Sequence, residues 1–128
     1  MADRLMTTEV SLPAVPGSVR TARRTLADAA RDLELPADAL SIAELALSEL
    51  VTNAVVHGAS PIVLRIGGGE DQLRVAVLDS GPARPRADET QLDATGGRGL
   101  AIVAAVAGTW GVDPVPGDGK WVWFRVSL

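Results

Sequence analysis

The chain has 128 residues, 47% of them hydrophobic, and it contains no cysteine. This length suits a single domain over 1–128, with residues 1–6 expected to be flexible, and the composition excludes a disordered chain, disulfide scaffolds, thiol chemistry and cysteine-based zinc sites. The formal net charge of −4 argues against a general nucleic-acid binder.

No feature of the chain predicts secretion or a membrane anchor. An unbroken run of about 18 apolar residues, the length at which a transmembrane helix becomes a candidate, does not occur. Residues 1–10 lack the apolar stretch of a secretion signal. We therefore expect a cytoplasmic protein.

Three elements are predicted in the first half of the chain. Residues 7–12 alternate as a short strand, which Pro13 ends. Apolar residues at helical spacing predict a helix from about 18 to 33 and a longer one over 36–57, which Gly58 ends. The second helix has the strongest periodic signal in the chain.

The second half is predicted to be mostly strands. Residues 61–66 and 72–79 form a hairpin whose turn contains 67–71, since glycine and aspartate favour such turns. The polar stretch 80–97 is a long loop, and loops of this length are often functional. The remaining predicted elements are a helix over 98–108 and strands near 110–115 and 120–127.

The predicted order of elements, β-α-α-β-β-loop-α-β-β, indicates an α+β fold. Helices beside a mostly antiparallel sheet form a two-layer sandwich, with the helices on one face. We find neither an internal repeat nor a linker that would divide the chain.

The second helix carries a polar stripe formed by Glu49, Asn53 and His57. Residues four apart are neighbours on one helix face, so a carboxylate, an amide and an imidazole lie in a row. The carboxylate can serve as a general base, and an amide oxygen is a hard ligand that suits Mg²⁺. An ordinary solvated helix face has the same pattern, and spacing alone does not separate the two interpretations.

Two glycine-containing segments complete the candidate site. Asp79 ends a predicted strand and can accept a hydrogen bond from an exocyclic amine, while Gly81 would let a flat ring approach the backbone. Residues 96–100, Gly-Gly-Arg-Gly-Leu, open a predicted helix whose N-terminus favours phosphate. An ordinary turn and a flexible hinge are the respective alternatives.

In their order and spacing, these segments resemble a known set of nucleotide-binding motifs. Residues 49–58 resemble the N box of the gyrase, Hsp90, histidine-kinase and MutL ATPase superfamily, residues 79–81 its G1 box and residues 97–100 its G2 box. The resemblance extends from about Thr8 to Leu128. Within the superfamily the chain is similar to the anti-sigma-factor serine kinases, which implies a Bergerat-type ATP-binding fold.

The resemblance implies a role for each matching residue. Asn53 would hold Mg²⁺ between the ATP phosphates, and Glu49 would be the base that activates a serine hydroxyl. Asp79 would bind the adenine amine, with Gly81 beneath the ring, and 82–96 would form the ATP lid. The phosphates would be contacted by Gly97, Arg98, Gly99 and Leu100.

The same resemblance implies protein partners. The phosphate acceptor would be a serine on an anti-anti-sigma (STAS) protein, a sigma factor would be the second partner, and the kinase would be a homodimer. Arg20 lies where such kinases present a basic contact residue, although it can equally serve to solvate its helix. Direct binding to nucleic acid or to a membrane is not expected.

Two departures from the family pattern keep a second hypothesis open. Ala83 stands where the G1 box often has another glycine, and Trp121 stands where a threonine often supports the adenine-binding aspartate. Both leave room for a catalytically weak regulatory module that binds ATP and a protein partner without efficient phosphoryl transfer.

Overall fold

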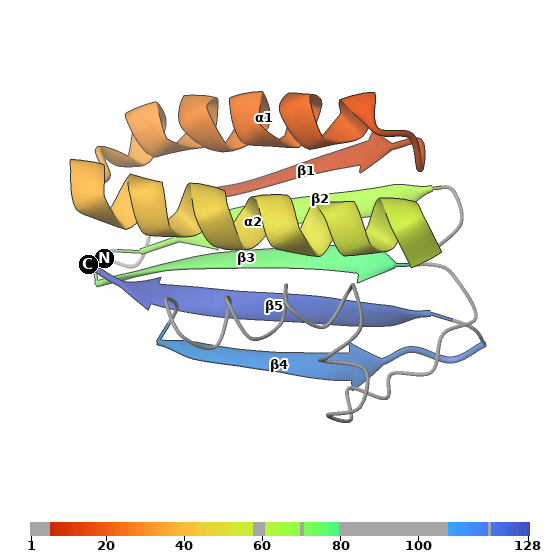
Figure 1. Cartoon of the computed structure of the whole chain (residues 1–128). Coiled ribbons are helices and arrows are strands. Elements are labelled where there is room, and N and C mark those ends of the chain that lie inside the picture. Colours follow the sequence, from red (N-terminus) through yellow and green to blue (C-terminus); the bar gives the residue numbers. More distant parts are fainter. Residues whose placement is uncertain (1–5, 58–60, 70, 80–107, 118) are drawn as a thin grey trace.

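The computed structural model describes residues 6–57, 61–69, 71–79, 108–117 and 119–128. In this part of the chain, five strands form one antiparallel sheet, and two helices lie on one of its faces (Figure 1). The predicted α+β class with its two layers is therefore confirmed, and the arrangement is consistent with the Bergerat-type fold that the motifs imply.

Every strand pairs with antiparallel neighbours. The strands are β1 (Met6–Leu12), β2 (Ile62–Gly68), β3 (Gln72–Asp79), β4 (Thr109–Pro114) and β5 (Lys120–Ser127). Their spatial order is β1-β2-β3-β5-β4, so the last strand of the chain lies between β3 and β4. β3 and β5 pair along their whole length, from Gln72 opposite Ser127 to Asp79 opposite Lys120. This register brings the end of β3 next to the start of β5.

The two helices follow β1 in the chain as α1 (Gly17–Leu33) and α2 (Ala37–His57). Near the start of α1, the buried Ser18 hydroxyl donates a hydrogen bond of 2.6 Å to the Pro13 carbonyl oxygen, which ties the helix to the chain leaving β1. After its last residue, Glu34 adopts a left-handed conformation with a φ of 56°, and the Leu35 N–H donates to the Ala30 carbonyl oxygen at 3.0 Å. Such a geometry satisfies the last carbonyl groups of a helix.

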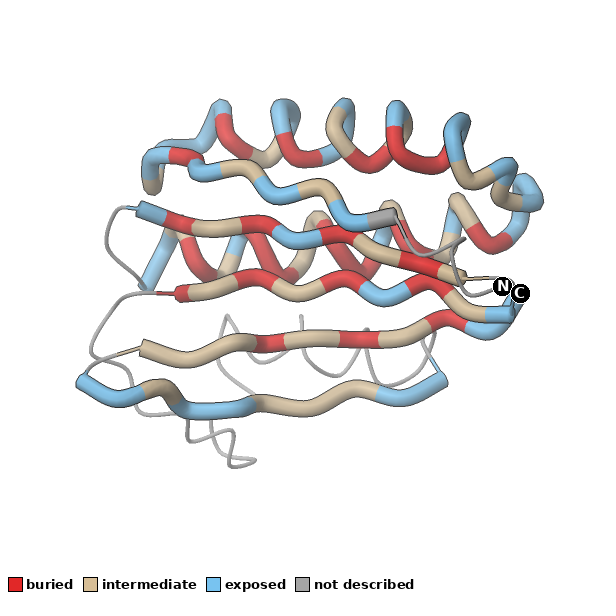
Figure 2. Tube along the Cα trace, turned by 180° about the vertical axis from the view of Figure 1, so that it is seen from behind, coloured by how far each residue is buried: buried red, intermediate tan, exposed pale blue. Residues whose placement is uncertain are grey.

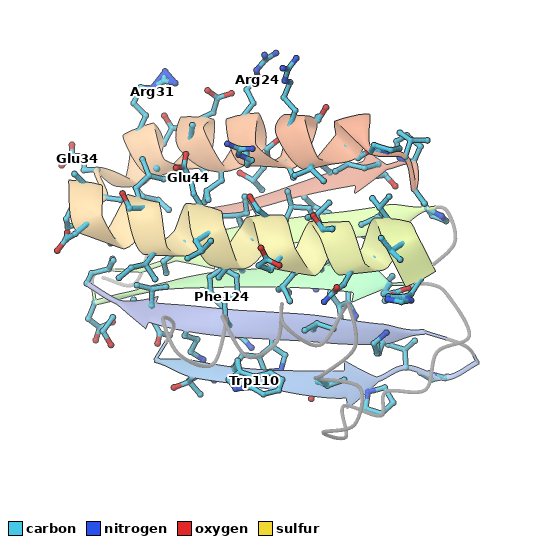
Figure 3. The ribbon with its side chains drawn as sticks, in the orientation of Figure 1. Arg24, Arg31, Glu34, Glu44, Trp110 and Phe124 are labelled. Carbon is cyan, nitrogen blue, oxygen red and sulfur yellow. The ribbon has the colours of Figure 1, made fainter. Side chains whose placement is uncertain are left out.

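The core lies between the helices and the sheet. α1 covers β1 and β2, whereas α2 covers β3 and β5. Alternate strand residues are buried, as Figure 2 shows from behind the sheet, and Phe124 extends from β5 toward α2 (Figure 3). The large side chains that are fully buried include Leu26, Leu47, Ile62, Leu64, Ile66, Leu73, Val75, Val77 and Phe124.

The β2–β3 hairpin is tighter than the sequence predicts. Gly67 and Gly68, expected in the turn, extend β2 because they pair with both β1 and β3. The Gly69 N–H then donates to the Gln72 carbonyl oxygen at 3.0 Å. A Cβ atom at Gly68 would lie 3.2 Å from the Gln72 carbonyl oxygen and 3.3 Å from Leu33 Cδ1. A side chain at Gly68 would therefore crowd Gln72 and Leu33, so this glycine serves close approach and not turning.

α2 has the length and apolar composition of a membrane span, with a mean hydropathy of 1.5 over an 18-residue window. The sequence predicts no such segment, because charged residues interrupt the apolar run. Within the described residues, α2 packs through Ala43, Leu47, Leu50 and Ala54 into the core above the sheet. A helix that packs into a core needs apolar residues, so this packing accounts for the hydropathy of α2.

Candidate functional site

Asp79 is the last residue of β3, and its carboxylate is buried on the helix side of the sheet. Strand alternation gives it this direction, because Val75 and Val77 are buried on the same face. Its Oδ2 accepts a hydrogen bond from Lys120 Nζ at 3.1 Å, and the two side chains are 6% and 14% exposed. A carboxylate at this depth requires such a partner, since an unpaired buried charge is strongly destabilising.

Lys120 is a candidate site residue that the sequence analysis missed. It is the first residue of β5 and pairs directly with Asp79, whereas Trp121 pairs with Leu78. Trp121, which stands where relatives often have a threonine, therefore points away from the Asp79 carboxylate, because neighbouring residues of a strand point to opposite faces. On the far face, the Arg65 guanidinium lies 4.5 Å from the Trp121 ring centroid. One sequence signal was available, since Lys120 is the chain's single lysine.

The polar stripe Glu49, Asn53 and His57 lies on α2. Glu49 and Asn53 are half-buried beside the buried positions Leu50 and Ala54, and His57 is exposed in the last turn. The helix fixes the backbone of both residues, and neither residue is fully buried. This combination suits groups that must meet a ligand in a defined orientation.

Several elements that carry these residues meet at one end of the molecule. The C-terminal end of α2, the end of β3 and the start of β5 lie there together, as does the N-terminal end of α1 (Figure 1). The fold thus brings Asn53, Asp79 and Lys120 to the same end, although they are far apart in the sequence.

Arg20 is exposed near the start of α1. The neighbouring Arg23 and Arg24 are exposed as well. Figure 3 shows Arg24 and Arg31 extending away from the sheet, so this helix presents a basic outer surface. Such a surface is compatible with a protein contact and with simple solvation of the helix.

The glycine-rich part of the predicted site lies outside the described residues. This holds for the long loop over 80–97 with its lid, and for most of the helix predicted over 98–108. It also holds for Gly58, Gly81, Gly97, Arg98, Gly99 and Leu100.

A hollow of about 490 Å³ lies on the opposite face of the sheet, which neither of the two described helices covers. Its lining includes Thr7, Arg65, Arg74, Trp121 and Trp123. These residues alternate with buried core residues along their strands, so they point away from Asp79. The hollow is therefore separate from the predicted nucleotide site.

The described residues include oxygen atoms that suit a nucleotide and its magnesium ion. No group of three or more His, Cys, Asp or Glu side chains that could hold a metal occurs in the described ranges. Mg²⁺ is commonly bound through one or two protein oxygens together with substrate phosphates. The Asn53 amide oxygen can supply one such ligand. The Asp79 carboxylate, which is paired with Lys120, can accept a hydrogen bond from the amine of a nucleotide base.

A family model described as a histidine kinase-like ATPase domain matches residues 12–126. This range contains Glu49, Asn53, Asp79 and Lys120. A comparison with curated proteins finds no match.

A solved structure with a similar fold contains the RsbU and RsbW domains of Rv1364c from Mycobacterium tuberculosis. The likeness has a TM-score of 0.73 and a sequence identity of 22%, and it covers 96% of this chain. This chain spans 33% of the length of that structure. At this level of identity the likeness shows a shared fold.

Proposed function

Because the chain belongs to the histidine kinase-like ATPase domain family, we propose that it binds ATP with Mg²⁺ and acts as a protein serine kinase of the anti-sigma-factor type. One observation carries the proposal. Asp79, whose carboxylate is buried, is the last residue of β3 and lies at the same end of the molecule as the C-terminal end of α2, the helix that carries Glu49 and Asn53 (Figure 1). The motif resemblance and the likeness to a structure with an RsbW domain support it.

In this proposal, the nucleotide is held by groups from three parts of the chain. The Asp79 carboxylate accepts a hydrogen bond from the exocyclic amine of adenine, with Gly81 beneath the ring. Gly97, Arg98, Gly99 and Leu100 contact the phosphates. Mg²⁺, when bound, neutralises phosphate charge, and the Asn53 amide oxygen is its protein ligand.

Glu49 is the proposed general base. Its carboxylate accepts the proton of a partner's serine hydroxyl while the hydroxyl oxygen bonds to the γ-phosphorus of ATP. The bond between that phosphorus and the β–γ bridging oxygen breaks, which yields phosphoserine and ADP. Phosphoryl transfer depends mainly on alignment and charge neutralisation, so a carboxylate on a rigid helix suits this role.

The proposed acceptor is a serine of an anti-anti-sigma (STAS) protein, and the second proposed partner is a sigma factor that the kinase sequesters. The exposed Arg20 on α1 is the proposed contact residue, with Arg23 and Arg24 extending the same basic surface. The resemblance also leads us to propose a cytoplasmic homodimer that regulates transcription through these contacts.

The first test is calorimetric titration of the full chain with ATP and Mg²⁺. We expect the wild type to bind and Asp79→Asn to bind at least about tenfold more weakly, because the amide has one acceptor oxygen, and if that oxygen accepts from Lys120 Nζ the NH2 donor faces the adenine amine. Asp113→Asn is the matched control, because Asp113 is exposed on β4. Absence of binding by the folded wild type would refute the proposed function.

Glu49→Gln separates a kinase from a module that binds ATP without transferring phosphate. We expect it to retain ATP affinity and to lose transfer from labelled ATP to a STAS acceptor protein by about a hundredfold or more, as for loss of a general base. Glu44→Gln, also half-buried on α2, should retain both properties. If Glu49→Gln and the wild type transfer phosphate equally, Glu49 is not the base; if the wild type binds ATP without transfer, the binding-module hypothesis is favoured.

A further inference from the structure

The Lys120 ammonium group lies beside the Asp79 carboxylate, to which the proposed function assigns the adenine ring. Its Nζ lies 3.1 Å from Asp79 Oδ2, and 14% of the Lys120 side chain is exposed. An ammonium group has three N–H donors and no acceptor. Among the described residues, Asp79 is its hydrogen-bond partner, so two donors are directed elsewhere.

The position of this donor is fixed by the sheet. Asp79 and Lys120 are directly opposite residues of the β3–β5 pair, and both lie on the helix face. Directly opposite residues of antiparallel strands have neighbouring side chains. The site therefore presents a carboxylate acceptor and an ammonium donor side by side at one end of the covered face.

The base edge of adenine has the complementary pattern. Its exocyclic amine is a donor, and the adjacent ring nitrogen N1 is an acceptor. The Asp79 carboxylate, which accepts hydrogen bonds when ionised, can satisfy the amine but not N1. A polar atom that loses water without gaining a hydrogen bond reduces affinity, so N1 needs a donor in a closed site.

We propose that Lys120 is a specificity-determining residue that donates a hydrogen bond to N1 of the adenine ring while it holds the Asp79 carboxylate in place. The inference rests on the proposed function, since it requires ATP at Asp79. It adds a direct contact between Lys120 and the base, which a purely structural counter-ion of Asp79 would not make.

The direct test uses the wild-type chain labelled with ε-¹³C,ζ-¹⁵N-lysine. Because Lys120 is the chain's single lysine, one side-chain NMR signal reports on it without any substitution. The probes are Mg²⁺ complexes of ATP, 1-deaza-ATP, in which N1 is replaced by C–H, and 3-deaza-ATP, the matched control altered on the other side of the ring. We expect ATP and 3-deaza-ATP to shift the signal similarly and 1-deaza-ATP to shift it much less.

Calorimetry on the same protein should show 1-deaza-ATP binding about tenfold more weakly than 3-deaza-ATP, as expected for loss of a hydrogen bond to a charged donor. In Lys120→Met this ratio should fall to about one, since the methionine side chain cannot donate. Thermal unfolding establishes whether that variant folds. If it does not, the labelled wild type alone decides the question.

The outcomes separate this inference from the proposed function. A wild type that binds no ATP overturns both. A wild type that binds ATP while its lysine signal is unmoved, or is moved equally by 1-deaza-ATP and 3-deaza-ATP, overturns the role of Lys120 and leaves the ATP-binding proposal standing. A folded Lys120→Met variant that keeps the tenfold ratio also overturns the role of Lys120.

Discussion

The two faces of the sheet are made by the same strands but have different chemistry. On β5, Val122, Phe124 and Val126 are buried beneath the helices, whereas the intervening Trp121 and Trp123 point to the other face. The covered face is almost wholly apolar, with the Asp79–Lys120 ion pair at its end. No described helix covers the second face (Figure 2), and this face combines tryptophan and arginine side chains.

The difference shows that a hollow and the candidate chemistry need not coincide. The hollow of about 490 Å³ is on the face with the tryptophans, where the guanidinium groups of Arg74 and Arg125 lie 5.9 and 5.1 Å from the Trp123 ring centroid. Asp79 is instead on the covered face, where burial makes its ion pair necessary. Position in the fold, and not the presence of a hollow, identifies the candidate site.

The largest predicted effect concerns the covered face. Phe124 is 0% exposed, so Phe124→Ala should destabilise the protein by about 3–5 kcal/mol through lost burial and an unfilled cavity. Trp121→Ala removes a larger side chain from the other face but should cost less, because Trp121 is half-buried. Urea unfolding of both variants measures the contrast. An equal or greater loss for Trp121→Ala would show that the second face is part of the core.

A smaller effect is predicted where the second face is tightly packed. A Cβ atom at Gly111 would lie 2.5 Å from Trp123 Cζ2, so Gly111→Ala should cost about 1–3 kcal/mol as the indole is displaced. Gly17→Ala is the control, because no atom lies within 4 Å of a Cβ placed there. Thermal unfolding should show a lower midpoint for Gly111→Ala alone. Equal midpoints for the two variants would mean that the indole moves freely.

The smallest effect is predicted for the exposed ion pair of the second face. Arg65 Nε lies 3.0 Å from Glu9 Oε1, with side chains 49% and 53% exposed, and the guanidinium also stacks on Trp121. Arg65→Ala should cost at most about 1 kcal/mol, since exposed ion pairs and exposed cation–π contacts are weak. Arg24→Ala, on the outer surface of α1, should be neutral. In urea unfolding, a loss for Arg65→Ala that rivals that of Phe124→Ala would contradict the distinction between the faces.

Much of the fold could be predicted because its signals are local. The apolar spacing of Ala22 and Leu26, and of Ala43 and Leu47, predicted helices that the structure contains. Alternation over 72–79 and 120–127 predicted strands whose bounds agree with β3 and β5. The hairpin turn was predicted too long, because Gly67 and Gly68 are turn residues by composition but strand residues by pairing.

The candidate site could be predicted in part. The stripe Glu49, Asn53 and His57 follows from helical spacing alone, and the structure places all three residues on α2. Lys120 could not be assigned to Asp79, because their contact depends on the register between two strands that are 41 residues apart at that point. A register shifted by one residue would have placed Trp121 opposite Asp79 instead.

The sequence by itself determined the elements, their order and the residue types available for nucleotide chemistry, because helical and strand periodicities are set by neighbours along the chain. The tertiary structure decided which residues meet. Pairing of β3 with β5 buries Asp79 with Lys120 on the helix face and sends Trp121 to the opposite face. Such contacts are set by strand register and sheet order, since side chains distant in sequence become neighbours once the backbone hydrogen bonds between strands are formed.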